Sequence, residues 1–157
     1  MTLHIFDLDR TIWDTYDITG RPIWAKQMLQ PYRKEGNVII DDVGSRCVLR
    51  ENISNYMKYL ISKGHEIGFL SVGAAWGLES KDQPSINLLK QFDIYDLFGE
   101  NRFLEYKTFS KADVLGKVNE CVFYDDDEKH LKSAEKIPGV TSHDSSSVVD
   151  WKVFYER

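Results

Sequence analysis

The sequence predicts an α/β fold in which a central, mainly parallel β-sheet packs against helices. Short apolar runs typical of buried strands alternate along the chain with segments whose apolar residues recur every three to four positions, as in amphipathic helices. Polar residues follow several of the apolar runs, and ligands of parallel sheets bind beyond the carboxyl ends of the strands. With 157 residues, 42% of them hydrophobic, the chain suits one domain with a single packed core.

Composition argues against several classes of protein. The net charge of −5 and the lack of a basic stripe disfavour binding to nucleic acids. No apolar run approaches the roughly 20 residues that a membrane-spanning helix needs, and the first residues lack the basic region of a signal peptide. Cys47 and Cys121 fit reduced thiols better than a disulfide framework. We therefore expect a cytoplasmic protein with no nucleic-acid and no membrane partner, and its oligomeric state is not predicted.

The first third of the chain is predicted to hold one core strand, a small flap and a helix. The apolar residues Leu3, Ile5, Phe6 and Leu8 are typical of a buried strand. Residues 12–36 show no regular pattern, whereas the apolar residues at 38–49 flank a turn sequence and predict a β-hairpin. Apolar positions recur with helical spacing at 53–61, and Gly64 is placed to end that helix.

The remaining residues continue the alternation of strands and helices. Further strands are predicted at residues 66–71, 103–106 and 121–124 and near residue 140. Further helices are predicted from Pro84 to residue 92, from Ser110 to residue 118, at 131–137, and, capped near Ser145, up to residue 154. Together these elements make a three-layer, Rossmann-like domain over residues 1–157, with residues 12–50 inserted after the first strand as a small flap built on the β-hairpin.

The first strand runs into Asp7 and Asp9, followed by Thr11. Side chains two positions apart on a strand share a face, so both carboxylates can point at one small volume. Two carboxylates about 5 Å apart repel by roughly 3 kcal/mol at an effective dielectric of about 20, so such a pair requires a cation or a shared proton. The pattern indicates phosphoryl chemistry, in which one carboxylate attacks, the other transfers protons and Mg²⁺ neutralises the cluster.

Three further groups fall at or just beyond predicted strand ends. Ser71 follows the second core strand, a lysine at 107 or 111 precedes a helix, and three aspartates at 125–127 follow a late strand. This order resembles the haloacid dehalogenase superfamily, whose motifs are hydrophobic-Asp-x-Asp-x-Thr, hydrophobic-Ser/Thr, Lys and hydrophobic-Asp-Asp. Within it the chain is most similar to the magnesium-dependent phosphatase-1 family. The similar stretches are residues 6–13, 88–93, 122–126 and 138–141, and the resemblance spans roughly residues 3–143.

The resemblance implies a phosphatase with an aspartyl-phosphate intermediate. Asp7 would be the nucleophile, Asp9 the general acid and base, and Lys107 the cation that offsets the charge of Asp7 and the phosphoryl group. Mg²⁺ would be held by the carboxylate of Asp7, the main-chain carbonyl of Asp9 and Asp126, with Asp125 as the other member of the acidic pair. Thr11, Ser71 and Arg10 are expected to bind the substrate's phosphate, Arg10 because the family's arginine after the serine motif is replaced here by Val72. The substrate would be a phosphoprotein or a small phosphorylated metabolite.

Several alternatives stay open at this point. Lys111 competes with Lys107 for the lysine role, Asp127 is also consistent with a helix cap, and His130 is expected to be exposed. Trp13 and Trp24 either line the entrance of the site or pack in the core. A receiver-type phosphoacceptor module, which does not turn over, uses a similar set of residues. It normally carries its acceptor aspartate after a middle strand, so the position of Asp7 after the first strand disfavours it.

Overall fold

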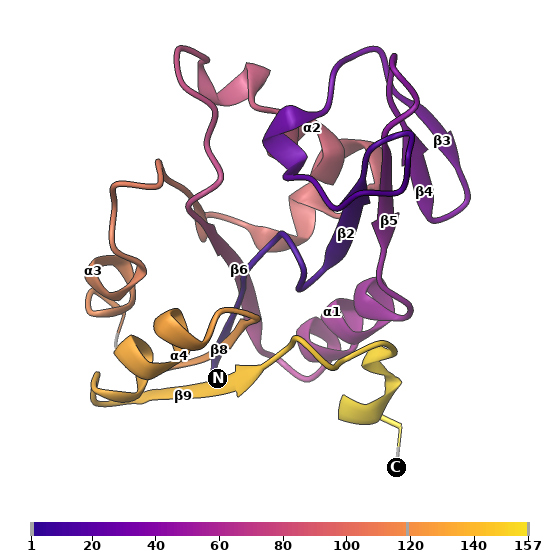
Figure 1. The fold of residues 1–157 in the computed structure, drawn as a ribbon. Helices are drawn as coiled ribbons and strands as arrows, with labels where there is room; N and C mark the ends of the chain where they lie inside the picture. Colours follow the sequence, from indigo (N-terminus) through magenta and orange to yellow (C-terminus); the bar gives the residue numbers. More distant parts are fainter. Residues whose placement is uncertain (1, 119, 157) are drawn as a thin grey trace.

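The computed structural model describes residues 2–118 and 120–156 and confirms the predicted α/β fold (Figure 1). Five strands form one sheet in the order β7-β6-β1-β8-β9, and every neighbouring pair in it is parallel. The strands are β1 (Leu3–Phe6), β6 (Glu66–Ser71), β7 (Arg102–Leu104), β8 (Cys121–Asp125) and β9 (Val140–Asp144). The chain adds β6 on one side of β1 and β8 on the other, so the end of β1 is the switch point at which such sheets bind ligands.

Helices cover both faces of this sheet, which gives the predicted three layers. The helices are α1 (Ile53–Ser62), α2 (Pro84–Gln91), α3 (Lys111–Leu115) and α4 (Glu128–Glu135). Side chains alternate between the faces of the strands: Phe6 and Phe69 pack in the cluster that includes α1, whereas Ile5 and Leu70 pack in the cluster that includes α3 and α4. The near-continuous apolar runs read from the sequence follow from this burial on both faces.

The flap is a four-stranded antiparallel sheet in the order β2-β5-β4-β3. The predicted hairpin is confirmed as β4 (Val38–Ile40) and β5 (Arg46–Leu49), but the expectation that residues 12–36 are irregular was wrong. β2 (Trp13–Tyr16) pairs with β5, and β3 (Arg33–Glu35) pairs with β4. The side chains of β3 are all exposed, so this strand rests on backbone pairing that leaves no apolar pattern in the sequence.

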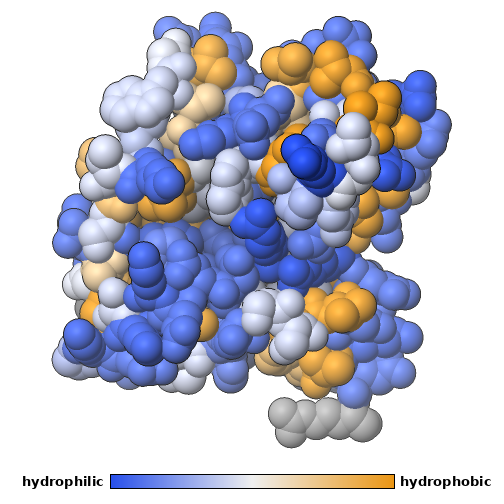
Figure 2. Space-filling view, in the orientation of Figure 1, coloured by the Kyte–Doolittle hydropathy of each residue, from blue (hydrophilic) through white to orange (hydrophobic). Residues whose placement is uncertain are grey.

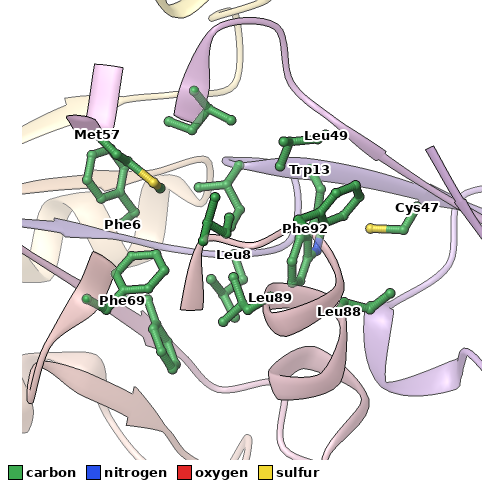
Figure 3. Packing of buried hydrophobic residues seen from close by; sticks show 14 of the residues in the cluster. Phe6, Leu8, Trp13, Cys47, Leu49, Met57, Phe69, Leu88, Leu89 and Phe92 are labelled. Carbon is green, nitrogen blue, oxygen red and sulfur yellow. The ribbon is translucent and has the colours of Figure 1, made fainter. Parts of the chain in front are cut away.

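The flap and the parallel sheet share one hydrophobic core. Trp13 and Cys47 from the flap belong to the same cluster as Leu8, Leu89 and Phe92 (Figure 3). The rings of Trp13 and Phe92 lie 6.2 Å apart. Because its apolar side chains are buried in this common core, the flap is held in place over the end of β1.

Several predicted boundaries are confirmed, and the last helix is not. Gly64, at φ +86°, follows α1, and Pro84 is the first residue of α2. At the end of the chain only a short 3-10 helix, η4 (Trp151–Phe154), forms, and its cap is Asp150 rather than Ser145. Ser145 is instead fully buried inside the molecule. None of the helices in the described residues is long and apolar enough to cross a membrane.

The imidazole ring of His4, on β1, packs next to the rings of His65 and Tyr124. The Nδ1 atom of His4 lies 2.8 Å from the hydroxyl of Tyr124, which in turn contacts the hydroxyl of Tyr56. Burial, with the nearby charges of His65 and His143, lowers the pKa of His4 to about 4. His4 is therefore neutral in the folded protein at neutral pH.

This lowered pKa predicts a loss of stability in mild acid. Below about pH 6.5 the unfolded chain takes up a proton at His4 that the folded protein does not accept until about pH 4, so the free energy of unfolding falls as the pH drops through this window. In His4→Gln, which cannot titrate, we expect the fall between neutral pH and about pH 4.5 to be smaller by about 2 kcal/mol. Urea unfolding of both proteins across this range tests the expectation, and identical pH dependence would contradict it.

Candidate active site

A cavity of about 460 Å³ opens at the carboxyl ends of the central strands. Its lining comes from the loops after β1, β6 and β8, from the starts of α3 and α4 and from the flap. Its floor is acidic, and basic and aromatic side chains from the flap and from the loop before α3 complete its wall. The cavity thus brings together the residues predicted to form the site at the strand ends, which are Asp7, Asp9, Ser71 and the aspartates at 125–127. The face of the molecule in Figure 2 is largely hydrophilic, with apolar side chains in separate patches.

Asp7 lies directly after β1, where its backbone N–H donates to the carbonyl of Tyr124 and so continues the pairing with β8. Its carboxylate is buried and has two side-chain partners. The ammonium of Lys111 lies 2.8 Å from Oδ1, and the hydroxyl of Thr11 donates to Oδ2 at 3.2 Å. The carboxylate is therefore fixed in orientation at the switch point of the sheet.

The lysine beside Asp7 is Lys111, which corrects the preference for Lys107. Lys111 is the first residue of α3, and its side chain is only 3% exposed, with the ammonium 5.7 Å from the centre of the Phe123 ring. Lys107 is exposed and lines the cavity without contacting any carboxylate among the described residues. The sequence placed Lys111 just inside a helix, and only the packing of that helix against β8 reveals that its side chain turns inward.

Asp125 anchors Lys111 from the other side. Its Oδ2 atom lies 2.6 Å from the Lys111 ammonium and 3.1 Å from Nδ1 of His130, and Oδ1 accepts the backbone N–H of Asp127. Burial acts to raise the pKa of Asp125, but the hydrogen bond from His130 and the charge of Lys111 outweigh it and lower the pKa to about 2. His130 is thus partly buried against Asp125 rather than simply exposed, and Asp127 caps α4 by accepting from the backbone of Lys129.

Asp126 completes an acidic cluster with Asp7 and Asp125, in which one oxygen from each lies within 4.8 Å of the others. Burial is the main cause that raises the pKa values of Asp7 and Asp126, and the charge of Asp125 adds to both shifts. Carboxylate oxygens at this separation suit a hard cation such as Mg²⁺. Asp125 has three protein partners and no exposed surface, whereas Asp7 has two partners and is slightly exposed, so Asp7 and Asp126 are the better candidates for ligands and Asp125 the weaker one.

Asp9 faces the same cavity but is held by the flap. Its Oδ1 atom accepts hydrogen bonds from Nε1 of Trp13 at 3.0 Å and from the backbone N–H of Ala25 at 3.1 Å. Its side chain is not part of the acidic cluster. Burial raises the pKa of Asp9, and these two hydrogen bonds only partly oppose the shift. Trp13 therefore belongs to the core and also orients a site residue.

Ser71 and Gly73 form the wall next to Asp9. Ser71 ends β6, and its hydroxyl oxygen accepts the backbone N–H of Gly73 at 3.1 Å. A Cβ atom at Gly73 would lie 3.2 Å from that hydroxyl oxygen and 3.5 Å from Oδ2 of Asp9. Glycine at this position leaves both groups facing open space, as the expected contact of Ser71 with phosphate requires.

Thr11 has a different position from the one expected. It is fully buried and does not line the cavity, so its predicted direct contact with phosphate is corrected to a contact with Asp7. Its hydroxyl also lies 2.7 Å from that of Ser145, whose carbonyl accepts from Arg50 at 2.7 Å. Arg50 in turn pairs with Asp14 of β2 through two hydrogen bonds. This chain of contacts links the flap to Asp7.

These supporting residues were not predicted from the sequence. Ser145 stood in a run of serines that reads as a helix cap, and Arg50 stood at the end of a predicted strand, where an arginine is ordinarily solvated. Nothing in their local sequence indicates a partner more than 30 positions away.

Arg10 and Trp24 stand together at the wall of the cavity. The guanidinium of Arg10 lies 4.2 Å from the centre of the Trp24 ring, and Trp24 is 45% exposed. Trp24 therefore lies at the entrance, one of the two positions expected for it, and Arg10 faces the cavity as its predicted role in binding phosphate requires.

Comparison of the chain with protein-family models and with curated protein sequences finds no match.

The buried ion pairs predict unequal roles for the two lysines in stability. Lys111→Met leaves Asp7 and Asp125 buried without their cation, so in metal-free buffer we expect the free energy of unfolding to fall by about 3 kcal/mol. Lys107→Met, the matched control on the surface, should change it by less than about 0.5 kcal/mol. Adding Asp125→Asn to Lys111→Met should recover part of the loss. Equal effects of the two lysine substitutions in urea unfolding would contradict this assignment.

Proposed function

We propose that the protein is a Mg²⁺-dependent phosphomonoester hydrolase of the haloacid dehalogenase type that acts through an aspartyl phosphate on Asp7. The observation that carries the proposal is the pairing of two carboxyl groups with different surroundings in one cavity. Asp7 is held by Lys111 within an acidic cluster, and Asp9 is held apart from that cluster by the flap. Pairs of acidic groups with separate environments are typical of catalysis that divides nucleophile and proton transfer between them.

Asp7 would attack the phosphorus atom. Thr11 and Lys111 fix the orientation of its carboxylate, so one oxygen can approach the phosphorus in line with the leaving oxygen. The charge of Lys111 would also offset the negative charge that develops on the phosphoryl oxygens. Magnesium, when bound by Asp7 and Asp126, supplies positive charge that keeps the buried carboxylates ionised and draws the phosphate toward them.

Asp9 would transfer the protons. Burial raises its pKa, so it holds a proton more readily than an exposed aspartate, and its Oδ2 atom faces the open space beside Gly73. In the first step it would protonate the leaving oxygen, and in the second it would accept a proton from the water that attacks the aspartyl phosphate. The bonds from Trp13 and Ala25 to its other oxygen keep it in position for both steps.

Ser71 would donate a hydrogen bond to a phosphoryl oxygen, because its own oxygen already accepts from Gly73 and its proton remains free for the cavity.

The substrate would be a phosphorylated metabolite or a phosphoprotein. The two cysteines are free and buried, as suits a reducing, cytoplasmic setting.

The proposal predicts Mg²⁺-dependent hydrolysis of p-nitrophenyl phosphate. Asp7→Asn removes the nucleophile and should lower kcat at least about 1,000-fold, and Asp9→Asn should lower it about 100-fold or more because proton transfer is lost. A chelator should abolish turnover and Mg²⁺ should restore it. Release of p-nitrophenol, followed by absorbance, measures all three.

Two outcomes would contradict the proposal. If Asp7→Asn hydrolyses the ester as fast as the parent protein, Asp7 is not the nucleophile. If the parent protein becomes stably phosphorylated without turnover, it is a phosphoacceptor module of the receiver type and not a hydrolase.

A further inference from the structure

Four basic side chains line the cavity in addition to Lys111, and the proposed chemistry uses none of them. They are Arg10, Lys26, Lys107 and Lys129. Among the residues that the structure describes, none of the four forms an ion pair with a carboxylate, although other surface cations do, such as Lys132 with Glu128. Lys107 and Lys129 are exposed, whereas Arg10 and Lys26 are partly buried. The last two therefore present positive charge inside the cavity.

The backbone at Arg10 supports a role in binding. Arg10 has φ +60°, in the left-handed region that non-glycine residues rarely adopt, at a cost of order 1 kcal/mol. Its N–H donates to the carbonyl of Trp13 at 2.8 Å, and its guanidinium stacks on Trp24. These contacts hold the charged group at the wall of the cavity, next to Asp9. A strained arginine that lacks a carboxylate partner is expected where a ligand supplies the anion.

Lys26 comes from the flap. It lies in the short 3-10 helix η1 (Ala25–Gln27), next to Ala25, whose N–H binds Asp9. The side-chain oxygen of Gln27 accepts the N–H of Trp24 at 2.8 Å, which fixes this turn. Arg10, in the loop after β1, and Lys26, in the flap, thus both border the position of the proton-transferring carboxylate.

The phosphate to be transferred already has its own cation in the protein. Lys111 lies between Asp7 and Asp125, on the floor of the cavity. Arg10 and Lys26 border Asp9 rather than this ion-paired cluster, so their positive charge is available to a second group. A guanidinium presents a fork of donors that fits phosphate or carboxylate, and a stacked guanidinium is held ready for such an anion.

We infer that the substrate is a small molecule with a second anionic group, a phosphate or a carboxylate, which Arg10 and Lys26 bind while the first phosphate is hydrolysed. The inference rests on the proposed function and names its substrate class. A cavity of about 460 Å³ is large enough to enclose a small ligand. A bisphosphorylated sugar and a phosphorylated carboxylic acid are ligands of this size.

The test compares matched ligands with one and two anionic groups. The probes are fructose 1,6-bisphosphate against fructose 6-phosphate and 3-phosphoglycerate against glycerol 3-phosphate, which separate a phosphate from a carboxylate as the second group. Binding to Asp7→Asn in Mg²⁺, measured by calorimetry, needs no turnover. At least one doubly anionic probe should bind about 10-fold more tightly than its partner, the gain expected from one additional charge-assisted contact.

Variants then assign that gain to residues. Arg10→Gln and Lys26→Gln, each combined with Asp7→Asn, should remove most of the difference and leave the singly anionic probes unchanged. Lys132→Gln, a surface lysine on α4 outside the cavity, is the matched control and should change neither. Inhibition of p-nitrophenyl phosphate hydrolysis by the same four probes gives a second readout on the parent protein, in case the Asp7 variant folds poorly.

Equal affinity for both members of both pairs would overturn the inference. So would an equal loss for singly and doubly anionic probes in Arg10→Gln, because Arg10 would then serve the transferred phosphate. Failure of the proposed function is seen separately, as absence of hydrolysis by the parent protein, and leaves the calorimetric comparison intact.

Discussion

The ion pairs of Lys111 with Asp7 and Asp125 are the contact on which the site depends. They place a cation with 3% exposure between two buried carboxylates, one after β1 and one at the end of β8. A buried charge without a partner costs several kcal/mol, so each of the three groups requires the others. Because α3 carries Lys111, this requirement also fixes the position of α3 against the sheet. The same ion pairs therefore hold the acidic floor of the cavity together and fix the packing of α3 in the outer layer.

The flap contributes to the site in a second way. It shares the hydrophobic core with the parallel sheet, and from that fixed position it binds Asp9 through Trp13 and Ala25. A mobile lid would have to form these bonds anew at each closure, whereas here they are already present. The two carboxyl groups of the proposed mechanism thus come from one short segment of chain but receive their environments from different parts of the fold.

Much of this architecture could be predicted from the sequence because it rests on local patterns. Strands buried on both faces give apolar runs, Pro84 and Gly64 mark helix boundaries, and the spacing of Asp7 and Asp9 places both at one strand end. Two of the errors depend on contacts between distant segments. Whether a lysine points inward depends on how its helix packs, and Thr11 is buried against Ser145 from the far end of the chain. The other two are local but leave no apolar pattern: β3 pairs through its backbone with the neighbouring β4, and His130 contacts Asp125 five positions before it.

The most direct test of the account is chemical trapping of the proposed intermediate. Borohydride reduces an acyl phosphate to the alcohol, so acid-quenched protein taken during turnover of p-nitrophenyl phosphate would carry homoserine in place of the phosphorylated aspartate. We expect peptide mass spectrometry to find this conversion at position 7, and we expect the conversion to disappear when Mg²⁺ is removed. Turnover with position 7 unmodified, or with the conversion at Asp126 instead, would contradict it.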